Sequence, residues 1–495
     1  MDFDWGINYP YREGSFYLGK NNLGGDVGLS SERHAITIAG AGAGKGATVI
    51  IPNLKRWPHN ALVIDPKGEA VEATWRDREA MGQAVHVLDP FGVAEVPDHL
   101  KARINPLDVI DPKSRTARED IRVLADGLVM RNDPRSAHWD DGALEVLAGY
   151  MAYALVSDDP KKRNLPYVRH LLTQGSLGDI LDDMEQREGV GNLMRSASSK
   201  LKNTGSESAH FLSGATSNTS WLDSEAISET LQDSTFQLSD LKEKPCTVFL
   251  VLPAHLLGEH GRFLRLFVRA SLDAMAKGGT KGGRRCLFLL DEFYSLGYID
   301  EIAKASGLMR CYGVQLWPIL QDLGQLIKLY DREGAETFFG NADLHQFFGN
   351  SDGMTLDYIA QQVGVTRTEE KGGIPKLSPQ EIREFVSKRP GDTVARRSIC
   401  FMPGSSIIAV HPAPYFWERS PTEPATQMNQ GKQKLASLIL SPMSWAIGVI
   451  VALLVTSLVL HIRGVGDPDA LFAMTCVLIV CFAGFAVFQW AVKNR

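Results

Sequence analysis

The segment at residues 34–48 has the residue types of a phosphate-binding loop: an apolar run ends in a glycine-rich turn that carries one lysine. Glycines allow the backbone to curl until several N–H groups point at one phosphate, and a following helix adds the positive end of its dipole. Lys45 supplies a charge for the β- and γ-phosphates. We therefore predict a nucleotide-binding loop whose members are Gly40, Gly42, Gly44, Lys45, Gly46, Ala47 and Thr48.

This loop departs from the usual G-x-x-x-x-G-K-[ST] pattern at two positions. Ala39 stands where the first glycine belongs, and Gly46 stands where the magnesium-binding hydroxyl belongs. Thr48 is a substitute ligand by residue type, although its spacing differs, and Asp65 or a water molecule is the alternative. A flexible glycine loop in an α/β core is the competing interpretation of the same residues.

Adjacent carboxylates follow a second apolar run at residues 286–290. A continuous apolar run is typical of a strand buried on both faces of a parallel sheet, and ligands bind outside the carboxyl ends of such strands. We expect Asp291 to hold Mg²⁺ through water and Glu292 to orient and deprotonate the attacking water. The alternative is a helix N-terminus that carries acidic residues.

A third apolar run, at residues 314–320, is followed by Gln321. An amide at the end of this strand is placed to sense the γ-phosphate and to report its hydrolysis. A polar residue that is merely satisfied at a strand end explains the pattern nearly as well.

A mostly parallel sheet must bring these three segments together, which predicts an α/β fold. Short apolar runs alternate with helical patterns, as in βαβ units. We predict its strands at residues 61–65, 84–88, 248–252, 287–290, 315–320, 344–348 and 406–410.

The sequence pattern changes at about residue 113, from apolar strand-like runs to helical patterns. Amphipathic helices are predicted at residues 118–130, 141–155 and 177–187, and Gly-, Ser- and Asn-rich joints at residues 196–220. An all-α domain therefore interrupts the sheet. We predict a nucleotide-binding domain at residues 1–112 and 241–417, an inserted helical domain at 113–240, a linker at 418–441 and a membrane segment at 442–492.

The composition of the 495-residue chain is that of a globular protein, with 44% hydrophobic and 22% charged residues. A formal net charge of −6 argues against a generally basic nucleic-acid surface, so any DNA contact must come from a local patch or the inside of a channel. Six cysteines without C-x-x-C spacing indicate neither a zinc site nor disulfides.

Two uncharged or nearly uncharged apolar runs, at residues 443–462 and 470–492, have the length of membrane-spanning helices. Basic residues flank the pair on the outside, whereas the short loop between them carries one arginine, Arg463, against Asp467 and Asp469. The positive-inside rule therefore predicts a multi-pass hairpin with both chain ends in the cytoplasm.

One set of short segments carries a resemblance to a known family: residues 44–46, 49–54, 63–69, 104–106, 138–139, 289–293, 309–313 with Gln321, and 348–355. On these segments, which follow one another in order within residues 15–415, the chain resembles the type IV secretion coupling proteins, the TraG/TraD-type conjugation ATPases of the FtsK/HerA-like P-loop superfamily. The Gly-Lys-Gly loop followed by Ile-Pro-Asn and then Asp-Pro-Lys-Gly-Glu is quite specific for this family.

The resemblance implies a RecA-like domain that binds ATP and Mg²⁺ between the subunits of a homo-hexamer, at the bacterial inner membrane. It also implies Arg310 as a finger that reaches the neighbouring subunit's γ-phosphate, although a surface arginine explains the same residue equally well. Family members usually carry their membrane helices at the N-terminus. Here no predicted span precedes Lys45, so we expect the C-terminal hairpin to anchor the protein.

The leading hypothesis is a membrane-anchored ATPase that recruits a relaxase–ssDNA complex and drives its transfer into a type IV secretion channel through inner-membrane components. One alternative is a coupling ATPase for secreted effector proteins only. Another is a substrate receptor that binds ATP but barely hydrolyses it. The intact Asp291–Glu292 pair argues against a receptor with little ATP hydrolysis, whereas the missing hydroxyl in the glycine loop favours it.

Overall fold

The computed structural model describes residues 3–130, 134–280, 283–299, 302, 309–366, 374–402, 404 and 407–417. The chain divides into a unit of residues Met1–Glu418 and a second unit, Arg419–Arg495, and all described residues belong to the first. No helix in this described part is long and apolar enough to cross a membrane. The linker and the two predicted spans, at 443–462 and 470–492, lie outside the described residues.

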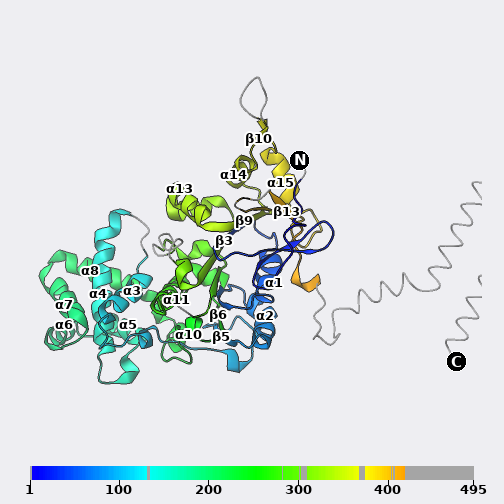
Figure 1. Ribbon diagram of the computed structural model, residues 1–495. Helices are drawn as coiled ribbons and strands as arrows, with labels where there is room; N and C mark the ends of the chain where they lie inside the picture. Colours follow the sequence, from blue (N-terminus) through cyan, green and yellow to red (C-terminus); the bar gives the residue numbers. More distant parts are fainter. Residues whose placement is uncertain are drawn as a thin grey trace, which may run out of the picture. The chain divides into compact units, whose positions relative to one another are not determined.

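A nine-stranded sheet forms the centre of the first unit, in the order β13-β12-β9-β3-β8-β7-β4-β6-β5 (Figure 1). All neighbouring strands are parallel except that β12 runs antiparallel to both β9 and β13. The strands are β3 (His34–Ala39), β4 (Asn60–Ile64), β5 (Ala84–Leu88), β6 (Cys246–Leu250), β7 (Cys286–Leu290), β8 (Val314–Leu320), β9 (Ala342–Phe348), β12 (Ser398–Phe401) and β13 (Ile408–Val410).

The mostly parallel sheet predicted from the apolar runs is confirmed, and each predicted strand is present within a few residues of its expected bounds. The antiparallel strand β12 was not predicted, because its four residues follow a charged stretch and are too few to show a period. Two small antiparallel pairs were also missed: β1 (Phe16–Lys20) with β2 (Asp26–Leu29), and β10 (Val365–Thr366) with β11 (Ile374–Pro375).

Helices cover both faces of the sheet and bury two separate cores. The turn η1 (Gly46–Ile50), α1 (Ile51–Leu54) and α2 (Glu69–Ala80) cover one face. The other is covered by α11 (Leu257–Lys277), α13 (Leu323–Asn341), α14 (Gly353–Val363) and α15 (Pro379–Val386). Alternation along β4 shows the division, since Leu62 and Ile64 face one core while Ala61 and Val63 face the other.

A group of helices follows β5 and precedes β6 in the sequence, and most of them lie to one side of the sheet, at the left of Figure 1. Among described residues 89–130 and 134–245 there is no strand, only an isolated bridge from Lys101 to Val87. The helices are α3 (Ala117–Leu128), α4 (Ala137–Leu155), α5 (Leu165–Gln174), α6 (Leu177–Gln186), α7 (Leu193–Asn203), α8 (Ser206–Asn218), α9 (Glu225–Thr230) and α10 (Asp240–Glu243).

The joints expected at residues 196–220 are an error, because this segment contains most of α7 and all of α8. Both helices pack against α4, and small residues allow a close approach: a Cβ added to Gly149 would lie 2.2 Å from the Cβ of Ala197. Serine and asparagine dominate the exposed sides of these helices, which hid the helical spacing of the few buried residues.

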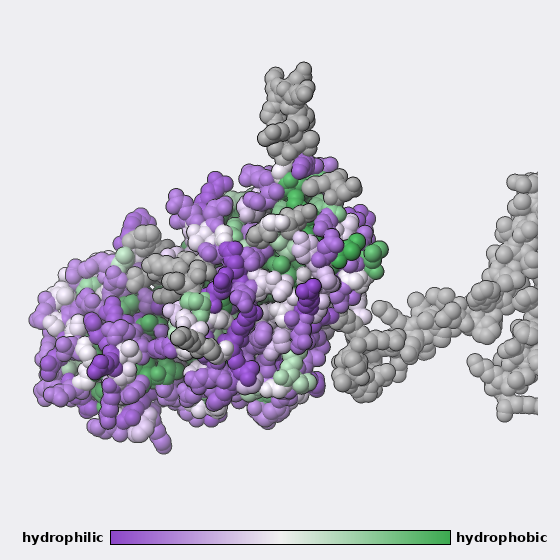
Figure 2. All heavy atoms as spheres, viewed as in Figure 1, coloured by the Kyte–Doolittle hydropathy of each residue, from purple (hydrophilic) through white to green (hydrophobic). Residues whose placement is uncertain are grey.

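The surface of the described part is mostly hydrophilic, as Figure 2 shows. In that view, hydrophobic surface gathers in two regions. One lies among the helices between β5 and β6, and the other lies where Figure 1 places the N-terminal segment, β13 and α15.

Candidate nucleotide-binding site

The glycine loop joins the carboxyl end of β3 to η1, and its shape depends on the absence of side chains at particular positions. Gly42 and Gly44 have φ angles of +69° and +94°, which favour glycine. A Cβ on Gly40 would lie 1.9 Å from the carbonyl oxygen of Gly349, and a Cβ on Gly44 would lie 2.5 Å from Val394. The loop is therefore a backbone cradle at the start of a helix, which suits the oxygens of a phosphate group.

Lys45 is brought together with both predicted carboxylates. Its Nζ lies 3.0 Å from Oδ1 of Asp291 and 2.6 Å from Oε1 of Glu292. Burial opposes the lysine charge, but the two carboxylates outweigh it and raise the pKa of Lys45. The contact follows from topology, because β3, β8 and β7 are parallel neighbours whose carboxyl ends meet at one edge of the sheet.

Gln321 joins the same cluster directly after β8. Its Nε2 donates to Glu292 at 3.3 Å from Oε2 and 3.5 Å from Oε1. Glu292 itself has a φ of +49°, an uncommon backbone conformation for a residue with a side chain. The backbone of Glu292 is thus locally strained, and contacts from Lys45 and Gln321 hold its carboxylate at the edge of the sheet where the glycine loop lies.

A further carboxyl group, Asp65, stands beside Asp291. Asp65 follows β4, whose Ile64 pairs in register with Leu290, the residue before Asp291. Asp65 is 5% exposed, and burial raises its pKa to about 7, although the N–H of Val71 donates to Oδ2 at 2.9 Å. Burial also raises the pKa of Asp291, whose charge in turn disfavours ionisation of Asp65.

Burial disfavours the charged forms of both carboxyl groups, and a divalent cation would favour those charged forms. No group of three or more His, Cys, Asp or Glu residues in the described part of the chain is arranged to hold a metal. Asp291 and Asp65 would therefore need phosphate oxygens or water to complete a Mg²⁺ site, as the coordination habits of Mg²⁺ require.

The structure does not bring Thr48 to this cluster. Thr48 is 1% exposed, and its hydroxyl donates to the carbonyl of Gly44 at 2.9 Å within the first helical turn. Because this hydroxyl is used by the backbone, the geometry favours Asp65 or water over Thr48 as the substitute ligand. Gly46 and Ala47 begin the helix, and a Cβ on Gly46 would meet nothing within 4 Å.

Arg310 lies apart from all the other predicted site residues. It is exposed on the short helix η10 (Met309–Tyr312), immediately before β8 begins. Since β8 is parallel to β3, Arg310 is at the amino edge of the sheet and the glycine loop is at the carboxyl edge. The residue does not serve the site of its own chain, and its role towards a neighbouring subunit stays a prediction.

A segment that the sequence did not single out, residues 386–396, covers the glycine loop. The N–H of Ala395 donates to the carbonyl of Ala43 at 2.9 Å, and Nζ of Lys388 lies 3.4 Å from the carbonyl of Gly42. These contacts join residues about 350 positions apart, so no local pattern reveals them. The only local signals are a Pro-Gly turn at 390–391 and four flanking basic residues.

Asn350 is a second residue that the sequence did not reveal as part of this site. It is 1% exposed and follows Gly349, whose carbonyl approaches Gly40. Within the described residues, neither Nδ2 nor Oδ1 of Asn350 has a hydrogen-bond partner. Leaving a buried amide without partners costs free energy.

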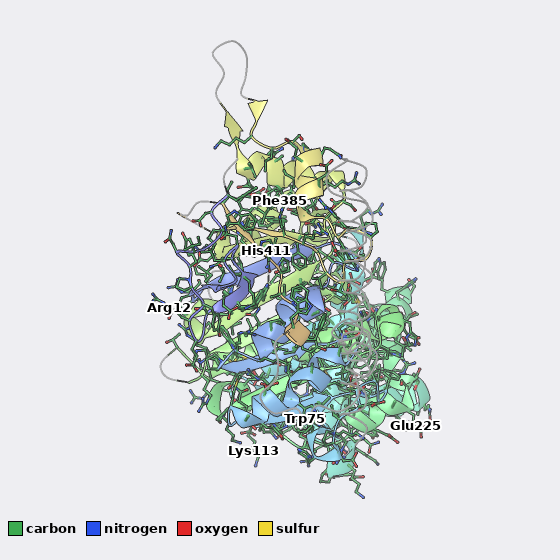
Figure 3. The ribbon with its side chains drawn as sticks, turned by 90° about the vertical axis from the view of Figure 1, so that its right-hand side faces the viewer. Arg12, Trp75, Lys113, Glu225, Phe385 and His411 are labelled. Atoms are coloured by element: carbon green, nitrogen blue, oxygen red, sulfur yellow. The ribbon has the colours of Figure 1, made fainter. Side chains whose placement is uncertain are left out.

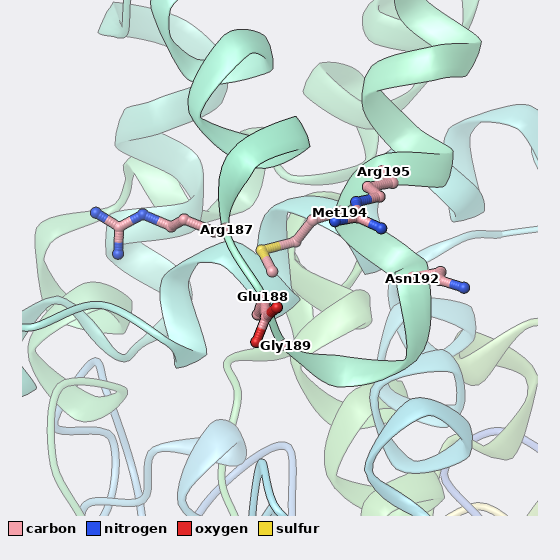
Figure 4. Close-up of a pocket in the computed structure, with 6 residues that line it drawn as sticks. All are labelled: Arg187, Glu188, Gly189, Asn192, Met194 and Arg195. Carbon is pink, nitrogen blue, oxygen red and sulfur yellow. The ribbon is translucent and has the colours of Figure 1, made fainter.

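A hollow of about 210 Å³ in the helical region provides no second site of the same kind (Figure 4). Arg187, Glu188 and Asn192 contribute polar groups to it, but Arg187 is already paired with Asp183 at 2.8 Å. These lining residues provide neither an activated nucleophile nor a loop for phosphate. The candidate nucleotide site is therefore the cluster around Lys45 at the carboxyl edge of the sheet.

Together, the parallel sheet, the glycine loop with Lys45 and the strand-end carboxylates define a P-loop α/β protein. Residues 4–381 match the family described as Type IV secretory system Conjugative DNA transfer, and the chain belongs to this family. This match confirms the resemblance inferred from the sequence motifs.

Relatives in this family carry the names of coupling and transfer proteins. Conjugal transfer protein TraG of Agrobacterium fabrum (strain C58 / ATCC 33970) is 28% identical over 382 residues, which cover 73% of this chain and 56% of that protein. The type IV secretion system-coupling protein VirD4 of Bartonella quintana (strain Toulouse) is 26% identical over 359 residues, covering 68% and 54%. The chain thus spans about half the length of these curated relatives.

Solved structures of a conjugative coupling protein share the fold. TrwBdeltaN70 in complex with sulphate has a TM-score of 0.63 at 16% identity, covering 81% of this chain and 90% of that one. TrwB in complex with ADP and Mg²⁺ has a TM-score of 0.62 at 16% identity, covering 82% and 92%.

Proposed function

We propose that this protein is an ATPase that couples substrates to a conjugative type IV secretion system. The single observation that carries the proposal is the contact of Lys45 with both Asp291 and Glu292, at the mouth of a glycine loop that begins a helix. Family membership supports the coupling role, and TrwB, which shares the fold, has been solved with ADP and Mg²⁺.

Each residue of the cluster has a defined part in ATP hydrolysis. The N–H groups of the loop and Lys45 hold the β- and γ-phosphates, so Lys45 must leave its carboxylate partners when the nucleotide binds. Asp291 would hold Mg²⁺ through water, and a bound Mg²⁺ would supply positive charge beside the phosphate oxygens.

The carboxylate that Lys45 releases, Glu292, then orients and deprotonates the attacking water. Gln321, already within 3.3 Å of Glu292, responds to the presence of the γ-phosphate.

We further propose that the protein works as a homo-hexamer in which Arg310 completes the neighbouring subunit's site. Arg310 is exposed at the amino edge of the sheet, on the opposite edge from the loop, and so is free to face a second subunit. A guanidinium at the γ-phosphate stabilises transition-state charge in trans.

The proposed cargo is a relaxase–ssDNA complex, received by the helices between β5 and β6 and passed to the channel's inner-membrane components. The proposed location is the bacterial inner membrane, with the segments at 443–462 and 470–492 as the anchor and both ends in the cytoplasm. A receptor that binds ATP with little hydrolysis is the second candidate. It is favoured by one observation, the burial of the Thr48 hydroxyl, which donates to the carbonyl of Gly44.

The test is ATP hydrolysis by the 495-residue chain in lipid nanodiscs, with and without single-stranded DNA, and with Lys45→Ala as the blank. Hydrolysis stimulated by DNA above the blank supports a nucleic-acid motor. Hydrolysis indifferent to DNA supports a coupling ATPase for effector proteins only. Bound ATP without hydrolysis above the blank supports the receptor and contradicts Glu292 as the catalytic base.

A further inference from the structure

A cavity of about 670 Å³ lies between the N-terminal segment and α15, away from the cluster around Lys45. This size is within the range of about 300–1,000 Å³ that is typical of small-molecule sites. Its lining includes Phe3, Trp5, Glu384, Phe385, Arg389 and Arg397. Figure 3 shows Phe385 on α15 near the upper end of the sheet, above His411, which follows β13.

Flat aromatic surfaces dominate the chemistry of this cavity. Phe3 and Phe385 stack with ring centroids 4.5 Å apart, and Trp5 stacks on His411 at 5.0 Å. The Arg397 guanidinium lies 4.7 Å from the Phe385 ring centroid and 5.9 Å from that of Trp5. Aromatic faces together with guanidinium and carboxylate groups are suited to a nucleobase, which stacks through its faces and forms hydrogen bonds through its edges.

The cavity and the glycine loop lie at the same edge of the sheet. Arg397 precedes β12, whose Ile399 pairs with Phe347 near the carboxyl end of β9. Arg389 follows Lys388, the residue whose Nζ lies 3.4 Å from the carbonyl of Gly42 in the loop. The segment that covers the loop therefore also forms part of the cavity wall.

The strand order suggests a direction for a bound nucleotide. The groups proposed to act at the γ-phosphate, Glu292 and Gln321, follow β7 and β8 on one side of the loop strand β3. With the γ-phosphate on that side, the base and ribose would extend away from β7 and β8, and the strands on that side of β3 are β9, β12 and β13. The aromatic cavity lies in that direction.

We propose that this cavity receives the base and ribose of the nucleotide whose phosphates bind to the glycine loop. The proposal rests on the nucleotide-binding function proposed above. It assigns Trp5 to stacking and Arg397 to the base edge, whereas Phe385, whose ring contacts Phe3 and Arg397, supports these two side chains.

The experiment compares two ligands of the 495-residue chain in nanodiscs by isothermal titration calorimetry. ADP occupies both the loop and the cavity, whereas inorganic tripolyphosphate occupies only the loop. We expect Trp5→Ala to weaken ADP binding by roughly tenfold or more, the scale of base–aromatic stacking, and to leave tripolyphosphate binding unchanged. Trp5→Phe keeps a ring and should retain most of the ADP affinity.

Two further variants sharpen the comparison. Arg397→Gln tests the cavity without removing an aromatic side chain, and we expect it also to weaken only ADP binding. Trp417→Ala is the matched control, because Trp417 is 63% exposed and does not line the cavity. This control should leave both affinities at their original values.

The outcomes separate this proposal from the proposed function. If Trp5→Ala and Arg397→Gln leave ADP binding unchanged while Lys45→Ala weakens both ligands, the base assignment is wrong and the phosphate site stands. If Trp5→Ala weakens both ligands equally, the cavity supports the loop and does not bind a base. If neither ligand binds to the original protein, or Lys45→Ala changes neither affinity, the nucleotide site itself is wrong.

Discussion

Replacing Asp65 by asparagine should stabilise the nucleotide-free protein above neutral pH. Burial raises the pKa of Asp65 from its ordinary value of 3.8 to about 7, so the folded protein binds this proton more tightly than the unfolded chain does. The stability that the proton contributes is fully present below pH 3.8 and is lost as pH rises through 7. At pH 8 the fold therefore holds a buried charge that Asp65→Asn removes.

The magnitude follows from the size of the pKa shift. A shift of about three units, at 1.36 kcal/mol per unit, corresponds to up to about 4 kcal/mol at pH 8. Asparagine keeps an oxygen that can accept the N–H of Val71, so the start of α2 need not lose its capping contact. We therefore expect Asp65→Asn to be more stable at pH 8 and close to the original protein at pH 4.

The assay is thermal unfolding of both proteins at pH 4 and pH 8, in the presence of a metal chelator. Asp98→Asn serves as the control, since its side chain is exposed and its removal changes net charge by the same amount. The reasoning is refuted if Asp65→Asn unfolds at a lower temperature than the original protein at pH 8. It is equally refuted if the difference between the two proteins does not depend on pH.

Three further predictions concern the loop and its proposed partners. Gly46→Ser should lower the Mg²⁺ concentration needed for half-maximal ATP binding, because the serine restores the missing hydroxyl and its Cβ meets open space. Gly44→Ser should abolish ATP binding, because Gly44 has a positive φ. ATP titrations of both variants at varied Mg²⁺ concentrations test these two expectations. Gln321→Ala should lower the rate of ATP hydrolysis by tenfold or more and leave the Kd for ATP within about twofold, measured by steady-state kinetics and calorimetry. Arg310→Ala and Lys45→Ala chains, each inactive alone, should regain ATP hydrolysis when they are mixed, because a mixed ring contains interfaces with both residues intact. If the two chains assemble together on a sizing column but hydrolysis does not recover, Arg310 does not act on the neighbouring subunit's site.

Much of the central sheet could be predicted because its strands are buried on both faces. The run of β7 is then apolar at every position and that of β4 at every position after Asn60, and their ends are marked by Asp291 and Asp65. In a parallel sheet such ends meet, so the contact of Lys45 with Asp291 and Glu292 follows from the strand order without further information.

The parts that were missed depend on contacts between distant segments or on weak local patterns. Lys388 reaches Gly42 only because α15 returns residues 386–396 to the loop, and nothing near Lys388 in the sequence indicates this. Thr48 has the right residue type for a metal ligand, but the helix offers its hydroxyl the carbonyl of Gly44 four residues earlier. The unpaired amide of Asn350 is visible only once its burial is known.

The most direct test of the central claim compares binding with hydrolysis in Glu292→Gln. If Glu292 is the general base, this variant should bind ATP with nearly the original affinity and hydrolyse it about 10²–10⁴-fold more slowly. The side chain keeps its size, so its contact with Gln321 need not be lost. Hydrolysis at the original rate by Glu292→Gln, under conditions in which Lys45→Ala is inactive, would contradict the account.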